Sequence, residues 1–169
     1  MTEYLQFLQR KRTRFTTTGI QITATDVNPI LFPFQRDLVS WACRKGRAAI
    51  FADTGLGKTF MQLEWARLMG SDTLIIAPRA VSKQTIREGM KLSIPVHYIR
   101  HDGEAQPGIC ITNYEMGVKM NLSRFGAIVL DESSILKGLT SKTRQRLTET
   151  CNNVPYRLCC TATPAPNDI

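Results

Sequence analysis

A loop with the composition of a phosphate-binding site lies at residues 52–59, ADTGLGKT. Gly55 and Gly57 would let main-chain N–H groups wrap closely around an anion. Lys58 would reach the outer phosphates of a nucleotide, and Thr59 would ligate Mg²⁺ at the start of a helix. The loop follows the apolar run RAAIF and precedes the helical pattern FMQLEWARLMG, which is the setting that this chemistry requires. We therefore predict nucleotide binding here rather than a glycine-rich turn, through Asp53, Thr54, Gly55, Leu56, Gly57, Lys58 and Thr59.

Two neighbouring carboxylates follow another apolar run, in GAIVLDESS at residues 126–134. Asp131 and Glu132 would emerge at the end of a buried strand, where open α/β sheets bind their ligands. Neighbouring side chains of an extended segment diverge, so the two carboxylates can take different roles. We predict that Asp131 holds Mg²⁺ and that Glu132 polarises the attacking water, with Lys58 completing the catalytic set. The alternative is a solvated acidic strand end with Ser133 as a helix cap.

Short apolar runs separated by helical or turn-like segments indicate the fold class. These runs are RAAIFA, TLIIAP, PVHYI, GICIT, GAIVL and YRLCC. Near-continuous apolar strands that alternate with helices are typical of an α/β fold, with a mostly parallel sheet covered by helices on both faces. Apolar spacing predicts two helices early in the chain, one ending at Gly46 and one ending at Gly70. Trp41 and Trp65 lie on the apolar faces of these helices and are expected in the core.

The first 30 residues are expected to form an N-terminal extension with a basic segment. Tyr4, Leu5 and Leu8 have helical spacing and precede basic side chains at positions 10, 11, 12 and 14. Residues 15–26, FTTTGIQITATD, alternate in polarity and predict a small strand or hairpin with Gly19 at its turn.

Composition narrows the class of protein. A formal net charge of +8 and a pI near 9.5 favour a polyanionic partner such as nucleic acid. The five cysteines are irregularly spaced and are typical of reduced thiols in the cytosol. No run approaches the roughly 18 apolar residues of a membrane helix, and the first residues lack the pattern of a secretory signal. We expect a cytoplasmic protein of a bacterial or phage-infected cell, without a membrane partner.

In their order along the chain, the motifs resemble the first motor domain of superfamily 2 helicases. The resemblance is strongest to the Snf-like branch of DNA translocases and to DEAD/DEAH-like proteins, including phage-encoded versions. LFPFQRDLVSW resembles the Q-motif region, and ADTGLGKT resembles motif I, in which alanine is common at the first position. LIIAPRAV and ITNYE are similar to motifs Ia and Ib, DESS to motif II and TATPAPN to motif III. The resemblance covers about residues 31–167.

This resemblance implies a RecA-like P-loop NTPase fold that binds ATP and Mg²⁺ and grips a nucleic-acid backbone. Gln35 would contact the adenine edge, and Thr161 and Thr163 would couple the nucleotide and nucleic-acid sites. Contacts with nucleic acid are expected from strand-end loops, at Arg79, Thr112, Asn113 and Tyr114. DESS is neither D-E-A-D nor D-E-A-H, and we expect DNA rather than RNA as the polymer.

The expected domain organisation is an extension at residues 1–30 and a RecA-like domain at residues 31–169. The resemblance also implies a second RecA-like domain that carries an arginine finger and is absent from this chain. An arginine finger contributes roughly 10³–10⁵ in rate, so the isolated domain is expected to bind ATP and to hydrolyse it weakly or not at all. The leading interpretation is the N-terminal ATP-binding domain of a DNA-dependent ATPase, helicase or translocase.

Two other functions remain compatible with the motifs. One is a non-motor module that binds nucleic acid or a partner protein with the help of ATP. The other is the motor lobe of a restriction-modification complex. Small-molecule kinases also use a phosphate loop, but they do not account for FPFQ, DESS and TATP together.

Basic side chains recur every four residues from motif Ia onward, at Arg79, Lys83, Arg87 and Lys91. This spacing places them along one slowly turning helix face, which we call the basic stripe. Backbone contacts made by such charges would be largely independent of base sequence and would weaken with salt. The competing interpretation is a solvated helix face without a ligand.

Overall fold

The computed structural model describes residues 17–23 and 25–164, without the side chain of Ser141. Its centre is a six-stranded sheet in the order β1-β6-β5-β2-β4-β3, in which every pair of neighbouring strands is parallel. The strands are β1 Arg47–Phe51, β2 Thr73–Ala77, β3 Val96–Tyr98, β4 Ile109–Asn113, β5 Ala127–Asp131 and β6 Tyr156–Thr161. The six apolar runs of the sequence are the six strands, and the predicted parallel α/β class is confirmed.

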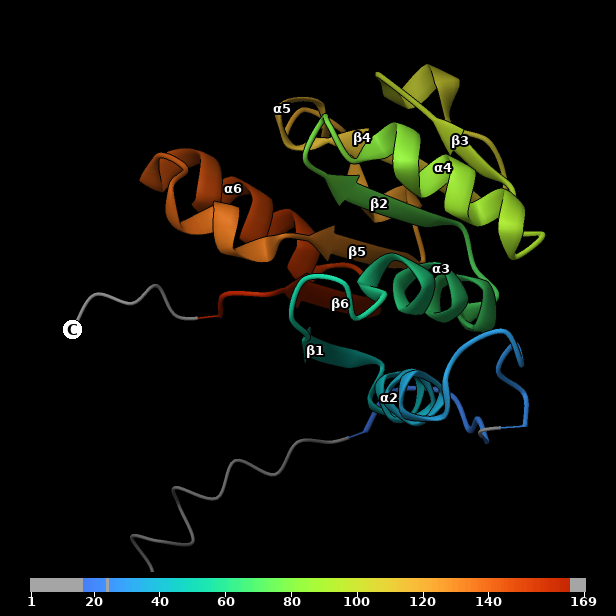
Figure 1. Ribbon diagram of the computed structural model, residues 1–169. Coiled ribbons are helices and arrows are strands. Elements are labelled where there is room, and N and C mark those ends of the chain that lie inside the picture. Colours follow the sequence, from blue (N-terminus) through green and yellow to red (C-terminus); the bar gives the residue numbers. More distant parts are fainter. Residues whose placement is uncertain (1–16, 24, 165–169) are drawn as a thin grey trace, which may run out of the picture.

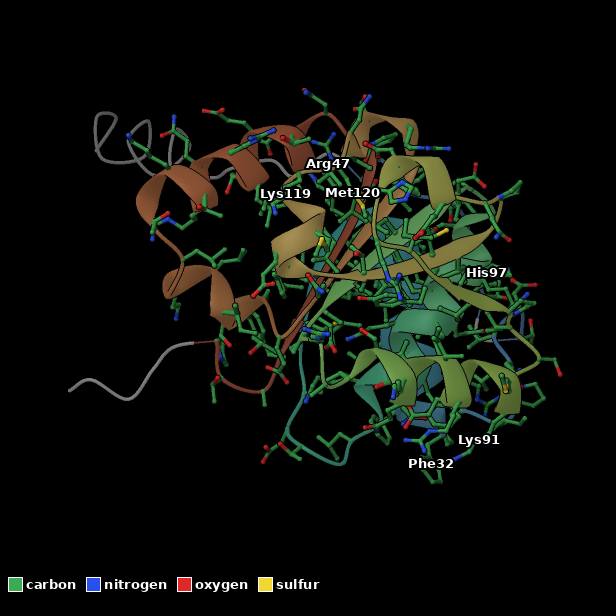
Figure 2. The ribbon with its side chains drawn as sticks, turned by 90° about the horizontal axis from the view of Figure 1, so that it is seen from above. Phe32, Arg47, Lys91, His97, Lys119 and Met120 are labelled. Carbon is green, nitrogen blue, oxygen red and sulfur yellow. The ribbon has the colours of Figure 1, made fainter. Side chains whose placement is uncertain are left out.

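Helices cover both faces of this sheet (Figure 1). One face carries α2 (Pro33–Lys45), α3 (Lys58–Met69) and α4 (Ser82–Lys91), and the other carries α5 (Tyr114–Gly117) and α6 (Ser141–Asn152). Three short 3₁₀ helices complete the described elements: η1 Asp102–Glu104, η2 Leu122–Arg124 and η3 Ser133–Lys137. Figure 2 shows Phe32 and Lys91 on one side of the molecule and Lys119 and Met120 on the other.

The strands and helices form where the sequence pattern places them. All five residues of β2, β4 and β5 are buried, as expected for strands with helices on both faces. Gly46 and Gly70 end α2 and α3 with positive φ angles, which a residue without a Cβ adopts at little cost. Trp65 of α3 is fully buried, so its predicted core position is confirmed.

Trp41 does not take the predicted core position. The buried side of α2 consists of smaller side chains such as Val39, Ala42 and Cys43, while Trp41 is 38% exposed. Its ring lines a groove beside Ala49 of β1. The face of α2 that packs on the sheet therefore differs from the predicted apolar face that contains Trp41.

The segment before α2 also differs from the prediction, because residues 17–23 form no strand. They run along the carboxyl end of α2, where the Thr18 N–H donates to Lys45 O at 3.4 Å and the Ile20 N–H donates to Cys43 O at 3.0 Å. Gly19 is not a turn residue here. A Cβ at Gly19 would lie 1.8 Å from Cys43 O, so glycine permits the close approach of two backbones.

Part of the predicted N-terminal extension packs on the domain itself. Val27 is 2% exposed and belongs to the same core as α2 and α3. The basic segment at positions 10–14 lies outside the described residues, and the domain boundary after residue 30 stays a prediction. Within the described residues, none of the helices has the length and apolar character needed to cross a bilayer.

Candidate nucleotide-binding site

The candidate site lies at the carboxyl edge of three neighbouring strands, β1, β6 and β5. The loop at residues 52–57 follows β1, Asp131 ends β5, and Thr161 ends β6. Parallel strands bring their carboxyl ends to the same edge, so residues far apart in the sequence meet there. In Figure 1 the connection from β1 to α3 lies beside the carboxyl ends of β5 and β6.

The loop has the backbone geometry of an anion cradle. Gly55 and Gly57 have φ angles of +85° and +74°, in the region that favours glycine. Gly57 is the N-cap of α3 and provides no side-chain acceptor, so no side chain caps the first-turn N–H groups of the helix. These groups and the helix dipole point positive charge towards the loop. A phosphate can bind there without displacing a cap.

Lys58 lies across the loop. Its Nζ donates to Ala52 O at 2.9 Å and to Asp53 O at 3.3 Å, and it lies 3.9 Å from Glu132 Oε1. The side chain is only 12% exposed. The ammonium group is therefore held between the loop and the carboxylate of Glu132, just after β5, which is where phosphate oxygens would need a counter-charge.

Asp131 is buried, at 5% exposure, and forms no ion pair with any described side chain. Gln62 Nε2 of α3 donates to its Oδ1 at 2.6 Å. Burial raises the pKa of this carboxyl above its usual value of 3.8, while the bond from Gln62 and the charge of Lys58 act in the opposite direction. A buried carboxylate of this kind is stabilised by a cation.

The oxygens around Asp131 fit a hard divalent cation. Gln62 Oε1 is buried and has no hydrogen-bond partner in the described part of the chain. Thr59, half-buried at the start of α3, brings a hydroxyl to the same edge. Carboxylate, hydroxyl and amide oxygens are the ligands that Mg²⁺ accepts. Gln62 was missed in the sequence, where the available signal was a polar residue between the apolar residues Met61 and Leu63.

Glu132 has an uncommon backbone conformation, and its side chain accepts a hydrogen bond from a neighbouring strand end. Its φ and ψ angles are 49° and 51°, a left-handed conformation that is uncommon for a residue with a Cβ. Thr161 Oγ1 donates to Glu132 Oε2 at 3.2 Å, and the Thr163 N–H donates to Thr161 Oγ1 at 3.1 Å. The structure thus brings together Lys58 and Glu132 with the two predicted coupling residues, Thr161 and Thr163.

Gln35 contacts the loop at residues 52–57 directly. Its Oε1 accepts from the Phe32 N–H at 2.9 Å, and its Nε2 donates to Leu56 O at 3.0 Å. A Cβ at Gly57 would lie 2.4 Å from this Nε2, so the amide packs tightly under the loop. The predicted adenine contact stays a prediction, and the observed contacts make Gln35 a support for the loop.

The four residues expected to contact nucleic acid are not equivalent. Arg79 is exposed in the connection between β2 and α4, as predicted. Thr112 and Asn113 belong to β4 rather than to a loop, and Tyr114 begins α5; all three are buried. Asn113 Oδ1 accepts from the Met116 N–H and caps α5. The placement of these three residues in a strand-end loop was wrong, and a polymer would reach their side chains only after a rearrangement.

The rest of the basic stripe is accessible. Lys83, Arg87 and Lys91 are exposed on α4, and Arg79 precedes the helix by three residues. The opposite side of α4 contributes Thr85 and Gly89 to the buried interior. Lys83, Arg87 and Lys91 therefore share one exposed helix face, as the four-residue spacing predicted, whereas Arg79 lies before the helix.

An all-parallel sheet with a glycine-rich loop, an acidic strand end and the bond between Thr161 and Glu132 at one edge is a RecA-like arrangement. Solved structures of that class match the chain. The UvsW helicase from bacteriophage T4 is 20% identical, with a TM-score of 0.66, over 79% of this chain and 52% of that chain. The SWI2/SNF2 ATPase core from Sulfolobus solfataricus, in complex with dsDNA, is 21% identical, with a TM-score of 0.70, over 88% of this chain and 35% of that chain.

A further structure of T4 UvsW is 18% identical, with a TM-score of 0.66, over 95% of this chain and 34% of that chain. At these identities the likeness establishes the fold, and the RecA-like prediction is confirmed at that level. The chain spans between about a third and about half of the length of these proteins. No protein-family model and no curated protein matches the sequence.

Proposed function

We propose that this chain is the N-terminal ATP-binding domain of a superfamily 2 ATPase that acts on DNA as a helicase or translocase. The observation that carries the proposal is the meeting of three strand ends around Lys58. Its ammonium lies 3.9 Å from Glu132 Oε1, and the other oxygen of Glu132 accepts from Thr161. A glycine-rich turn or a solvated acidic strand end would not require these contacts.

The residues of the site divide the work of ATP hydrolysis. The N–H groups of the loop and Lys58 would bind the β and γ phosphates. Thr59 and Asp131 would hold Mg²⁺, which neutralises charge on the phosphates when bound. Glu132 would orient the attacking water and accept its proton, because its carboxylate is anchored by Thr161 and remains partly exposed. Gln35 supports the loop from below.

Motion along DNA would require that changes at the nucleotide site alter the DNA-binding site. The Thr161 hydroxyl donates to Glu132 and accepts from the Thr163 N–H, which supports a role for both threonines beside the γ phosphate that a bound ATP would bring to Glu132. Arg79 and the basic stripe offer exposed positive charge for a DNA backbone. The complex of the Sulfolobus SWI2/SNF2 core with dsDNA supports DNA as the polymer. We infer that a second RecA-like domain acts with this one and supplies the arginine finger.

The first test is nucleotide binding by the chain itself. Lys58→Ala removes the ammonium that would pair with the phosphates, and we expect affinity for a fluorescent ATP analogue with Mg²⁺ to fall at least about tenfold. Lys119→Ala, an exposed cation on the other face of the sheet, is the matched control and should bind as the unchanged chain does. Equal affinity of the Lys58 variant and the control would contradict the proposal.

A further inference from the structure

Tyr114 makes a contact that the predicted roles do not explain. Its hydroxyl donates to the main-chain oxygen of Asp131 at 2.7 Å, and both groups are buried. Tyr114 follows β4, whereas Asp131 ends β5, and β2 lies between these two strands in the sheet. The contact therefore crosses a complete strand to reach the motif II residues.

The position of this contact lets it control the orientation of the peptide between Asp131 and Glu132. Strand pairing between β2 and β5 ends at Ile76 and Leu130, so no residue of β2 is paired with Asp131. The bound oxygen belongs to the peptide that joins Asp131 to Glu132. The orientation of that peptide sets the φ angle of Glu132, which is 49°. A residue with a Cβ persists in this region only when its surroundings hold it there, at a cost of about 1–3 kcal/mol.

Tyr114 is well suited to hold the peptide. Burial raises the pKa of its hydroxyl, and the charge of Asp131 adds to this effect, so the group stays protonated and donates. The helix that carries it is itself fixed, because Asn113 caps it and a Cβ at Gly117 would lie 3.0 Å from Ile76 Cδ1. The donor is thus attached to a tightly packed element rather than to a mobile loop.

We propose that Tyr114 is a positioning residue of the nucleotide site, whose hydroxyl holds the Asp131–Glu132 peptide so that both carboxylates face the phosphate loop. The roles of Asp131 and Glu132 in this statement rest on the proposed function. The contact itself does not, and it can be tested with and without nucleotide. The inference also gives Tyr114 a role other than the direct nucleic-acid contact expected from its motif.

The first experiment uses the nucleotide-free chain and the variant Tyr114→Phe. Tyr156→Phe is the matched control, because it removes a phenolic hydroxyl from a half-buried side chain at the start of β6, at the end of the sheet away from the site. We expect hydrogen exchange of the amides at residues 131–135 to become about tenfold faster in Tyr114→Phe and to stay unchanged in the control. Unchanged exchange in Tyr114→Phe, or equal acceleration in both variants, would overturn the proposal.

The second experiment measures the affinity for ATP with Mg²⁺ and with EDTA. The ratio of the two dissociation constants reports how well Asp131 is placed for the metal. We take the ratio as the constant in EDTA divided by the constant with Mg²⁺, so a larger ratio means a larger gain from the metal. We expect Tyr114→Phe to reduce it about three- to tenfold, as the loss of one hydrogen bond would, while the affinity in EDTA stays within about twofold. A lower melting temperature with an unchanged ratio would show a merely structural role and overturn the inference. Absence of nucleotide binding by the unchanged chain would instead contradict the proposed function, and hydrogen exchange would still decide the role of Tyr114.

Discussion

At the scale of one residue, the burial of Asp131 costs stability that a bound cation would offset. The fold buries this carboxyl and leaves it without an ion pair among the described residues, with Gln62 as its side-chain donor. Burial favours the neutral acid and raises its pKa. The folded chain therefore binds this proton more tightly than the unfolded chain does. Ionised Asp131 lowers the free energy of unfolding, and Mg²⁺ would offset that cost.

A charge-removing substitution tests this account. The raised pKa means that stability is lost as pH rises from the usual value of 3.8 through the folded-state pKa. Asp131→Asn keeps an acceptor for Gln62 and removes the charge. We expect its melting temperature at pH 7, without Mg²⁺, to rise by about 2–4 °C, the shift that about 1 kcal/mol gives at this chain length. Below pH 3.8 the gain should vanish.

Asp37→Asn, an exposed substitution on α2, controls for the change in net charge. Differential scanning calorimetry between pH 3 and pH 7 measures both variants. If both variants change the melting temperature equally, or if Asp131→Asn is less stable than the unchanged chain at pH 7, the buried charge of Asp131 does not destabilise the fold.

Single residues also show where sequence reasoning ends. Lys58, Asp131 and Glu132 could be predicted because their spacing after apolar runs leaves few alternatives. Gln62 could not, because a polar residue on a helix gives no sign of which strand end it will face. The loop-supporting contacts of Gln35 were likewise hidden, because they depend on how closely α2 approaches Leu56.

At the scale of elements, boundaries were predictable and orientation was not. Glycines ended α2 and α3 where expected, since a positive φ is a local property. The face that α2 turns to the sheet depends on long-range packing, and Trp41 is exposed for that reason. The end of β4 was less predictable: Asn113 extends the strand past the apolar run GICIT because it pairs with Ala77 of β2, and this pairing has no signature in the motif itself.

The packing of residues 17–23 on α2 yields an element-scale prediction. A Cβ at Gly19 would meet Cys43 O at 1.8 Å and Gly46 N at 2.5 Å, so Gly19→Ala must displace one backbone from the other. We expect a loss of about 1–3 kcal/mol in the free energy of unfolding, measured by urea titration. Gly138→Ala is the matched control, because φ there is −83° and its nearest contact for a Cβ would be an ordinary 3.6 Å. The packing account fails if the two variants unfold at the same urea concentration.

At the scale of the whole molecule, the fold class followed from the six apolar runs, but the strand order did not. Alternating strands and helices favour right-handed crossovers and a parallel sheet. They do not say that β1 and β5 will flank β6, which is the arrangement that brings the glycine-rich loop after β1 to Glu132. The contact of Tyr114 with Asp131 depends on the same order. The site is therefore a property of the complete sheet, although its motifs are local.

The exposed charges of the basic stripe can be tested as a binding surface for DNA. Arg79 and Lys83 are exposed at the start of the basic stripe, and a DNA backbone bound there would release counterions. For the double variant Arg79→Ala and Lys83→Ala, we expect the slope of log affinity against log salt to become shallower by about 2, one unit for each lost phosphate contact. Because phosphates carry no sequence information, DNA duplexes of different sequence should lose affinity equally. Lys119→Ala removes a comparable exposed charge from the opposite face, and fluorescence anisotropy at several salt concentrations compares the variants. If the Lys119 variant changes the slope as much per charge as the double variant does, the molecule attracts DNA only through its net charge, and the basic stripe is not a binding surface.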